Sequence, residues 1–230
     1  MSEPGSRRGR AHDAEGAREA ILNAAEEVFA EHGFDGARID GIAKVSGYNK
    51  SLIFQYFDDK LGLYNEMIRR TDKEMSELQQ TILLKLMADE TTFTADRFKQ
   101  MLRDFMDAYF DYLLQHPRVM RIYMWELAEG WQTYAKIISE RDRQDVEQFQ
   151  PFLDRAAYAG LLYSSFAPMQ QVLMAEFIVP SFLATLPLYR LLIPEDDVSS
   201  PAALAQAKEF IINFIIRGLM RHSTEAKPQT

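Results

Sequence analysis

The chain has 230 residues, of which 47% are hydrophobic and 26% are charged, and its formal net charge is −8. This composition is typical of a globular protein with one large or two small domains and a sizeable core. The sequence contains no cysteine, which excludes disulfide scaffolds, thiolate metal sites and cysteine nucleophiles, and its acidity disfavours nonspecific binding to polyanions without excluding a local basic face.

The N-terminal region is predicted to contain a tail and a first helix. Residues 1–12 hold three arginines among Gly, Ser and Pro, which predicts a disordered basic tail. A basic arm that reaches into a DNA groove is the alternative. Apolar residues then recur at helical spacing from Asp13 to His32, with Asp13 as the N-cap and Gly33 as the C-terminal stop.

The rest of the chain is predicted to be helical as well. Two short helices are expected at about residues 39–45 and 49–56, after which Asp58 is expected to cap a long helix towards Leu86. No stretch alternates with period 2 between hairpin turns, so the predicted fold is all-α with about nine helices. The later helices are expected at 94–115, at 117–129 opening on Pro117, within 131–159 where Pro151 restarts or kinks the segment, from Ser165 and Pro168 to the bends at Pro180 and Pro187, and from the Ser200-Pro201 cap to Arg221.

Neither a signal peptide nor a membrane span is expected. The N-terminus is polar rather than apolar. Two stretches without charge, 156–175 and 177–189, contain polar residues or prolines and are predicted to be buried helices. The expected location is the cytoplasm, which the absence of cysteine fits.

Residues 46–60, SGYNKSLIFQYFDDK, combine a helix interruption, an apolar run and two lysines. A buried helical hairpin and a nucleic-acid-binding surface are the two candidate interpretations. Two short helices joined by a Gly-containing turn, after a longer helix, are the ingredients of a helix-turn-helix. The second short helix is expected to pack inward through Ile53 and Phe57 and to expose four side chains near its start: Lys50, Ser51, Leu52 and Gln55.

These exposed side chains have the chemistry that a DNA major groove requires. Lys50 could donate to guanine O6 and N7, and Leu52 could touch a thymine methyl. Tyr56 and Lys60 lie at the far end, where a hydroxyl and an ammonium could bind phosphates together with the free N–H groups of the next helix.

Residues 18–64 resemble the DNA-binding domain of the tetracycline-repressor (TetR) family of transcription regulators. The rest of the chain resembles that family only in its layout as an all-α domain. The features that carry the resemblance are Ile21-Leu22, Ala24-Ala25, Phe29, Gly33-Phe34, Ile42-Ala43, Gly47, Asn49-Lys50, Ile53, Tyr56-Phe57, Lys60 and Leu63-Tyr64.

The resemblance implies a division of labour along the chain. Residues 13–58 are expected to form the DNA-binding domain, residues 59–222 a helical effector-binding and dimerisation domain, and residues 223–230 a frayed tail. Helix two is implied to place Arg38 and Asp40 near the groove. Many family members have a threonine where this chain has Arg38, so we expect Arg38 to reach DNA and Asp40 to compensate the start of the helix as a carboxylate. Residues 38–60 carry four basic and three acidic side chains, so two copies are expected to act together on a double-stranded operator.

A pocket for a small, largely apolar effector is the functional interpretation of the aromatic and Met-rich helices in the second half of the chain. Plain core packing is the alternative, in which Glu126 and Glu129 pair with Arg118 or Arg121. The residues predicted to line the pocket are Phe105, Met106, Tyr109, Tyr123, Trp125, Glu126, Tyr163 and Phe166.

A homodimer is predicted from the last helix, which is apolar on nearly its whole circumference between residues 210 and 216. One face is expected to pack on its own core and the other on a second subunit. The interface residues predicted are Phe177, Phe182, Ile212 and Ile216.

Enzyme activity is the competing hypothesis, and a purely structural helical adaptor is the third. The four histidines are scattered, and the sequence has no metal-binding spacing, glycine-rich phosphate loop or nucleophile elbow. We therefore predict no catalytic residues, no metal and no cofactor. An all-α hydrolase or ligand carrier would remain if the likeness of the first 64 residues were coincidental.

Overall fold

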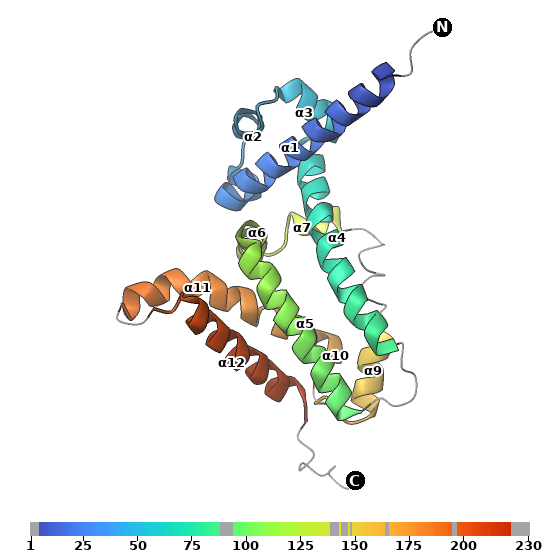
Figure 1. Ribbon diagram of the computed structural model, residues 1–230, viewed down its shortest axis with the longest axis vertical. Helices are drawn as coiled ribbons and strands as arrows, with labels where there is room; N and C mark the ends of the chain where they lie inside the picture. Colours follow the sequence, from blue (N-terminus) through green and yellow to red (C-terminus); the bar gives the residue numbers. More distant parts are fainter. Residues whose placement is uncertain are drawn as a thin grey trace. The chain divides into compact units, whose positions relative to one another are not determined.

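The computed structural model describes residues 5–87, 94–138, 143, 147, 149–163, 166–194 and 197–221. Within these ranges the fold is all-α, as predicted, apart from one isolated bridge between Leu162 and Met220 (Figure 1). The helices pack into two compact units. The first comprises Met1–Met75 and Pro117–Ile138, and the second comprises Ser76–His116 and Ser139–Thr230.

The first unit begins with a helix that is longer than predicted. Helix α1 (Gly5–Gly36) makes residues 5–12 helical rather than a disordered tail, and residues 1–4 lie outside the described part. The other helices of this unit are α2 (Ile39–Ser46), α3 (Lys50–Phe57), the first part of α4 (Lys60–Met87), α6 (Pro117–Ala128) and α7 (Tyr134–Ile137).

Two local signals fix the turn between α2 and α3. Gly47 follows α2 with φ 76°, the left-handed conformation that glycine adopts without steric cost. Asn49 caps α3, because its side chain accepts a hydrogen bond from the Leu52 amide at 2.9 Å. The helix-turn-helix predicted from the sequence therefore forms through its own turn and cap.

The turn into α4 differs from the prediction in its capping residue. Asp59 rather than Asp58 caps the helix, since Asp59 Oδ1 accepts a hydrogen bond from the Gly62 amide at 2.7 Å. Asp58 instead adopts φ 61° at the end of α3. The turn is so tight that a Cβ on Gly62 would lie 2.1 Å from the Phe57 carbonyl oxygen, so only glycine fits there.

The core of the first unit joins α3 to α1, α4 and α6. Ile53 and Phe57 of α3 are buried in one cluster with Phe29, Tyr64 and Ile122. The Phe29 and Tyr64 rings meet edge to face, with centroids 4.9 Å apart. The start of α4 and α6 therefore share the core of α1–α3.

A buried carboxylate connects α4, α6 and α7. Glu126 is only 2% exposed, and it accepts hydrogen bonds from the Tyr64 hydroxyl at 2.6 Å and from the Tyr134 amide at 3.0 Å. These bonds satisfy the carboxylate without the arginine expected from the sequence. Arg118 pairs instead with Glu27 of α1 at 2.6 Å.

Ionic contacts join α1 to α4 along their outer sides. The Arg70 guanidinium donates to Glu19 at 3.0 Å, to Asn23 at 2.7 Å and to Glu26 at 2.6 Å, and Arg18 pairs with Glu66. Because one planar guanidinium meets three acceptors, these contacts restrict the rotation of α4 against α1.

The second unit contains the last part of α4 and five further described helices. Pro151 lies in the first turn of α9, so it restarts a helix rather than kinking one. Pro180 lies near the start of α11 and Pro187 inside it, while Ser200 caps α12 as predicted. The helices are α5 (Ala95–Gln115), α9 (Gln150–Tyr158), α10 (Pro168–Glu176), α11 (Ile178–Leu192) and α12 (Pro201–Leu219).

Helices α5 and α12 run side by side in this unit (Figure 1). Lys208 of α12 bridges Asp107 at 2.8 Å and Asp111 at 3.0 Å. One turn before Asp107 on α5, Arg103 donates to Glu209 of α12 at 3.0 Å and to Asn213 of α12 at 2.7 Å. These charge-assisted contacts fix which face of α12 is turned towards α5.

Substitution of two helical glycines tests the tight turn before α4. Gly62→Ala is expected to lower the free energy of unfolding by about 1–3 kcal/mol, because its methyl group meets the Phe57 backbone. Gly16→Ala is the matched control. No heavy atom lies within 4 Å of its added Cβ, so its helix propensity should raise the free energy of unfolding by about 0.5–1 kcal/mol. Urea unfolding measures both, and equal stabilities of the two variants would contradict the described turn.

Candidate functional site

The outer face of α3 is the strongest candidate for a binding surface in the first unit. Lys50, Ser51 and Gln55 are exposed, as the sequence predicted. Ile53 is 0% and Phe57 3% exposed on the opposite side. Leu52 and Tyr56 were also predicted to contact DNA, but the structure places both partly in the core cluster, which leaves only part of each side chain for a ligand.

Phe54 belongs to this exposed face, although the sequence analysis did not select it. Its side chain is 43% exposed, and it lies four residues after Lys50, one helical turn along the same side. That spacing was the available signal. An exposed aromatic ring between a lysine and a glutamine can make the apolar contact with a thymine methyl that was predicted for Leu52.

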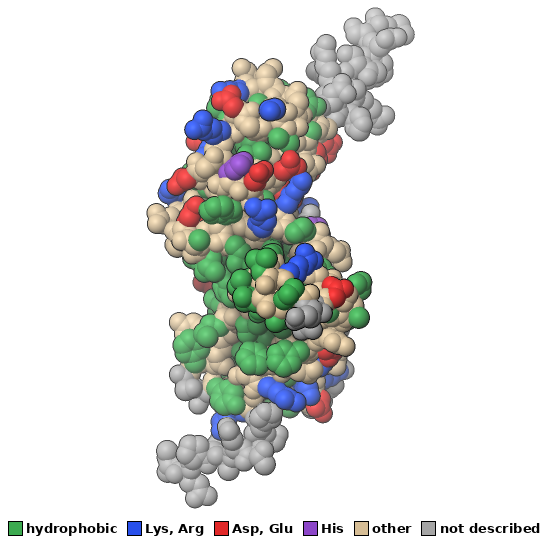
Figure 2. Space-filling view, turned by 90° about the vertical axis from the view of Figure 1, so that its left-hand side faces the viewer, with side chains coloured by type: hydrophobic (Ala, Val, Ile, Leu, Met, Phe, Trp, Pro, Cys, Tyr) green, Lys and Arg blue, Asp and Glu red, His purple; other side chains and the backbone are tan. Residues whose placement is uncertain are grey.

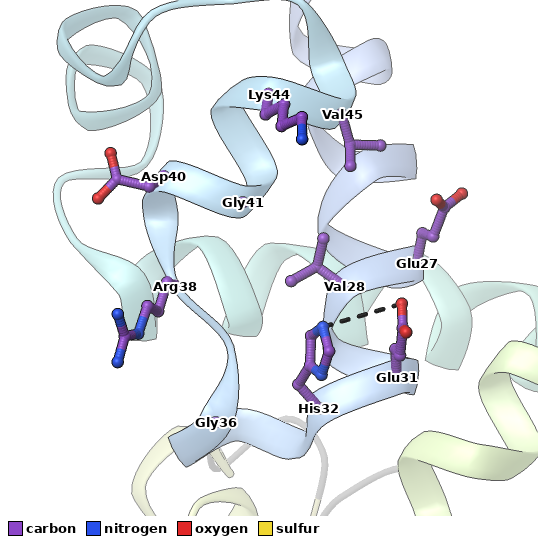
Figure 3. Close-up of a pocket in the computed structure, with 10 residues that line it drawn as sticks. All are labelled: Glu27, Val28, Glu31, His32, Gly36, Arg38, Asp40, Gly41, Lys44 and Val45. Atoms are coloured by element: carbon purple, nitrogen blue, oxygen red, sulfur yellow. Dashed lines mark ion pairs between the residues drawn. The ribbon is translucent and has the colours of Figure 1, made fainter.

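Two charged residues at the start of α2 flank the α3 face. Arg38 occupies the N-cap position without a side-chain cap hydrogen bond and is exposed. Asp40 is exposed and forms an ion pair with Lys50 of α3 at 2.6 Å. Figure 3 shows Arg38 and Asp40 projecting from α2 on the side away from α1. The structure thus brings Asp40 and Lys50 together, with Arg38 two residues before Asp40, and their contact with DNA stays a prediction.

A cleft of about 550 Å³ separates α1 from α2 (Figure 3). Val28, Gly41 and Val45 contribute apolar surface to it. Charged residues of both signs lie around it, and one pair among them joins Glu31 and His32 at 3.8 Å. Because charges of both signs line it, the cleft has no single-sign field that would select an anion or a cation. The residues that carry the ionisable groups are Glu27, Glu31, His32, Arg38, Asp40 and Lys44.

Lys60 lies at the start of α4, where it contacts the end of α1. Its ammonium lies 4.6 Å from the centroid of the Phe34 ring and donates to the Asp35 carbonyl oxygen at 3.4 Å. Burial lowers the pKa of Lys60, and the nearby Asp35 charge opposes this effect. The Lys60 ammonium, which is predicted to bind a phosphate, therefore already forms contacts between α4 and α1.

The residues predicted for an effector pocket are divided between the two units. Tyr123, Trp125 and Glu126 lie in the first unit, where Trp125 Nε1 donates to the Ala30 carbonyl oxygen at 3.2 Å. In the second unit, the rings of Phe105 and Tyr109 stack with centroids 6.0 Å apart. The other three residues of the second unit are Met106, which is 0% exposed, Tyr163, which is partly buried, and Phe166, which is 44% exposed.

Glu176 is a functional candidate that was not among the residues predicted from the sequence. It ends α10, and burial raises the pKa of its carboxyl to about 7. The pKa of Tyr109 is raised by burial and, to a lesser extent, by the Glu176 charge. A signal was present in the sequence, because Glu176 is the single charged residue between the uncharged stretches 156–175 and 177–189.

The outward face of α12 carries different residues from those predicted for a dimer interface. Ile212 is 0% and Ile216 4% exposed, so both pack inside their own unit. Phe210 and Phe214 face outwards, 72% and 58% exposed, and their rings stack with centroids 6.4 Å apart. Of the two phenylalanines predicted in or near α11, Phe177 is partly buried, and Phe182 lies 6.3 Å from Phe110 between ring centroids.

Exposed apolar side chains continue from α12 onto α11. Figure 2 shows hydrophobic side chains gathered on the face that these two helices form. By length and composition alone, Pro168–Leu192 could cross a membrane, and only 22% of its most apolar window is buried. Apolar patches of this kind on a protein surface mark sites of association. The exposed apolar residues in the last turns of α11 are Leu188, Tyr189, Leu191 and Leu192.

Comparison with known proteins links this architecture to transcription regulators. Residues 21–67 match the sequence model of the family described as bacterial regulatory proteins, tetR family. The HTH-type transcriptional repressor SCO4008 of Streptomyces coelicolor is 31% identical over 135 residues, which cover 59% of this chain and 61% of that protein. The HTH-type transcriptional repressor NicS of Pseudomonas putida is 25% identical over 224 residues, which cover 92% of this chain and 96% of that protein.

The same likeness extends to the fold. The crystal structure of a TetR family transcription regulator from Marinobacter aquaeolei VT8 superposes with a TM-score of 0.65 at 18% sequence identity, covering 93% of this chain and 100% of that one. At this level of identity the match concerns the fold of both units and not their ligands.

The environment of Glu176 predicts a pH-dependent stability. Its pKa in the folded protein is about 7, above the ordinary value of 4.5, so the folded state holds the proton more tightly. The protonated Glu176 carboxyl therefore contributes fully to the free energy of unfolding below about pH 4.5. This contribution, at most about 3 kcal/mol, is lost as the pH rises through 7. Glu176→Gln should therefore raise the melting temperature at pH 8 and leave it nearly unchanged at pH 5.

The control is Glu147→Gln, which changes the same charge at an exposed position. It should give equal shifts at both pH values. A Glu176→Gln variant whose stabilisation is the same at pH 5 and pH 8 would show that the carboxyl is hydrated in the folded protein.

Proposed function

We propose that the chain is a member of the tetR family of bacterial regulatory proteins, whose sequence model its residues 21–67 match, and that it is a cytoplasmic transcriptional repressor that binds a palindromic operator. The names of SCO4008 and NicS as repressors support the direction of regulation. The proposed active form is a homodimer that a small, largely apolar effector releases from DNA.

The observation that carries the proposal is the contrast between the two sides of α3. Its inner side is fixed in the core through Ile53 and Phe57, while its outer side offers Lys50, Phe54 and Gln55 to solvent. A stiff helix with an apolar back and such a front fits a major groove about 12 Å wide. Arg38 and Lys60 are proposed to seat it on the phosphates.

Two copies are required, because one copy carries little positive charge. Residues 38–60 have a net charge of only +1, so one copy provides few phosphate contacts. The stacked rings of Phe210 and Phe214 and the exposed end of α11 offer the apolar face for a second subunit. In the proposed dimer, the two α3 helices enter successive major grooves about 34–36 Å apart.

The effector is proposed to act in the second unit, beside Phe105 and Tyr109. Helix α4 runs from Lys60 in the first unit to Met87 in the second. A ligand that shifts α4 would change the separation of the two DNA-binding units. The required difference in affinity between the two states is about 1–3 kcal/mol.

This coupling predicts that ligands which raise the melting temperature also change operator affinity. Small aromatic and apolar compounds can be screened by thermal shift, and the hits can be tested by gel shift on a bound duplex. A set of hits that all stabilise the protein and leave its affinity for DNA unchanged would exclude the coupling.

Lys50 and Lys60 are expected to differ in their effect on sequence preference. Lys60→Ala should weaken binding to all duplexes alike and reduce the slope of log affinity against log salt by about 0.9 per subunit. Lys50→Ala should change which base is preferred at one position of each half-site, a discrimination of about 1–3 kcal/mol. Gel shifts at fixed salt on a bound duplex and its single-base variants measure both, and an equal loss on every duplex for both variants would contradict these roles.

The dimer surface is tested by charging its two outward rings. Phe210→Glu combined with Phe214→Glu should give a monomer in light scattering, because two carboxylates per subunit would be buried against an apolar face. Tyr158→Glu is the control, as it places one such carboxylate on an aromatic that is 96% exposed. A doubly substituted protein that stays dimeric would move the interface to another surface.

A further inference from the structure

The ion pair between Asp40 and Lys50 joins the two helices that face the proposed operator. Asp40 Oδ1 lies 2.6 Å from Lys50 Nζ, and the two side chains are 70% and 49% exposed. Asp40 lies in the first turn of α2, and Lys50 is the first residue of α3. The carboxylate is therefore held against the lysine that the proposed function assigns to base recognition.

The other basic residues of this surface have no such carboxylate. Within the described part of the chain, Arg38 and Lys44 have no ion pair, and the Lys60 ammonium meets a carbonyl oxygen and a ring. Lys50 is thus the one cation of residues 38–60 that a carboxylate neutralises at contact distance. An exposed ion pair of this kind contributes little to the stability of the fold. Its main effect is therefore on which further acceptors Lys50 can bind.

We infer that Asp40 is a specificity-determining residue, which lets Lys50 bind neutral acceptors on base edges and disfavours its binding to phosphates. This inference rests on the proposed function, because it concerns the discrimination between operator and other DNA. Removal of Asp40 should then raise the affinity for DNA, whereas removal of a residue that contacts DNA would lower it.

The discrimination follows from the charge of the second acceptor. A lysine ammonium has three N–H donors, so Lys50 can keep Asp40 and still donate to further acceptors. Guanine O6 and N7 are neutral, and they add no repulsion against the carboxylate. A phosphate oxygen is charged, and bringing it to the same ammonium places two negative groups within a few ångströms of each other. The repulsion therefore penalises phosphate contacts selectively.

Nonspecific DNA binding consists almost entirely of phosphate contacts, whereas operator binding adds base contacts. Asp40 should therefore weaken nonspecific binding more than operator binding. Each proposed dimer carries two copies of the ion pair, so both copies contribute to the difference in free energy between nonspecific and operator binding.

Asp40→Asn tests the inference, because it removes the charge and keeps the shape. We expect affinity for a random-sequence duplex to rise roughly 10-fold per dimer, with a steeper salt dependence as Lys50 gains phosphate contacts. Affinity for an operator recovered by selection should rise much less, so the ratio of the two affinities should fall. Fluorescence anisotropy at several salt concentrations measures both affinities, and an unchanged melting temperature confirms the fold.

Two further variants separate this role from simple removal of negative charge. Asp58→Asn removes an exposed carboxylate at the end of α3 and keeps the size and shape of the side chain, so it should raise both affinities by the same factor. In a Lys50→Met background, Asp40→Asn should likewise leave the ratio unchanged.

Three outcomes would overturn the inference: equal gains on both duplexes for Asp40→Asn, a lower affinity for both, or a change in the ratio that persists without Lys50. If the wild-type protein selects no duplex at all, the proposed function fails instead. The two failures are therefore distinguishable within one experiment.

Discussion

The buried carboxylate of Glu126 is the constraint on which the first unit depends. An ionisable group that is 2% exposed is tolerated only when its oxygens are satisfied, and here α4 and α7 supply the donors through Tyr64 and the Tyr134 amide. The Tyr64 ring also packs against Phe29 and Phe34 of α1. Tyr64 thus packs against α1 with its ring and binds Glu126 of α6 with its hydroxyl. Helix α3 packs against the same core through Ile53 and Phe57.

This construction is what the proposed DNA-binding surface of an acidic protein requires. Rigid backing by the core lets a few side chains on α3 be held in place before binding, so less ordering is required when DNA is met. In the proposed complex, the weak net charge of the surface favours discrimination, because affinity for arbitrary DNA depends on the number of phosphate contacts. The ion pair of Asp40 with Lys50 is inferred to have the same effect at the Lys50 side chain, because it disfavours a phosphate contact there.

Features that depend on neighbouring residues were predictable from the sequence, and features that depend on distant ones were not. The caps at Asn49 and Ser200 and the left-handed turn at Gly47 are local, and the structure contains each of them. Which of two adjacent aspartates caps α4 was not predictable, because the choice depends on how closely Gly62 approaches the Phe57 carbonyl.

The rotation of α12 is a tertiary property of the same kind. Its sequence is apolar on nearly all sides. The burial of Ile212 and Ile216, together with the contacts of Lys208 with α5 and of Arg103 with α12, leaves Phe210 and Phe214 facing outwards. The partners of Glu126 are equally remote, since Tyr64 lies 62 residues away. Periodicity identifies a helix with two apolar faces, and packing decides which face remains exposed.

Selection of bound duplexes from a random pool shows whether α3 reads DNA as a symmetric pair. If a rigid α3 reads DNA in a symmetric pair, the recovered sequences should contain an inverted repeat whose half-sites are centred about one helical turn apart. Recovery of a single unrepeated site, or of no enriched sequence at all, would contradict the account.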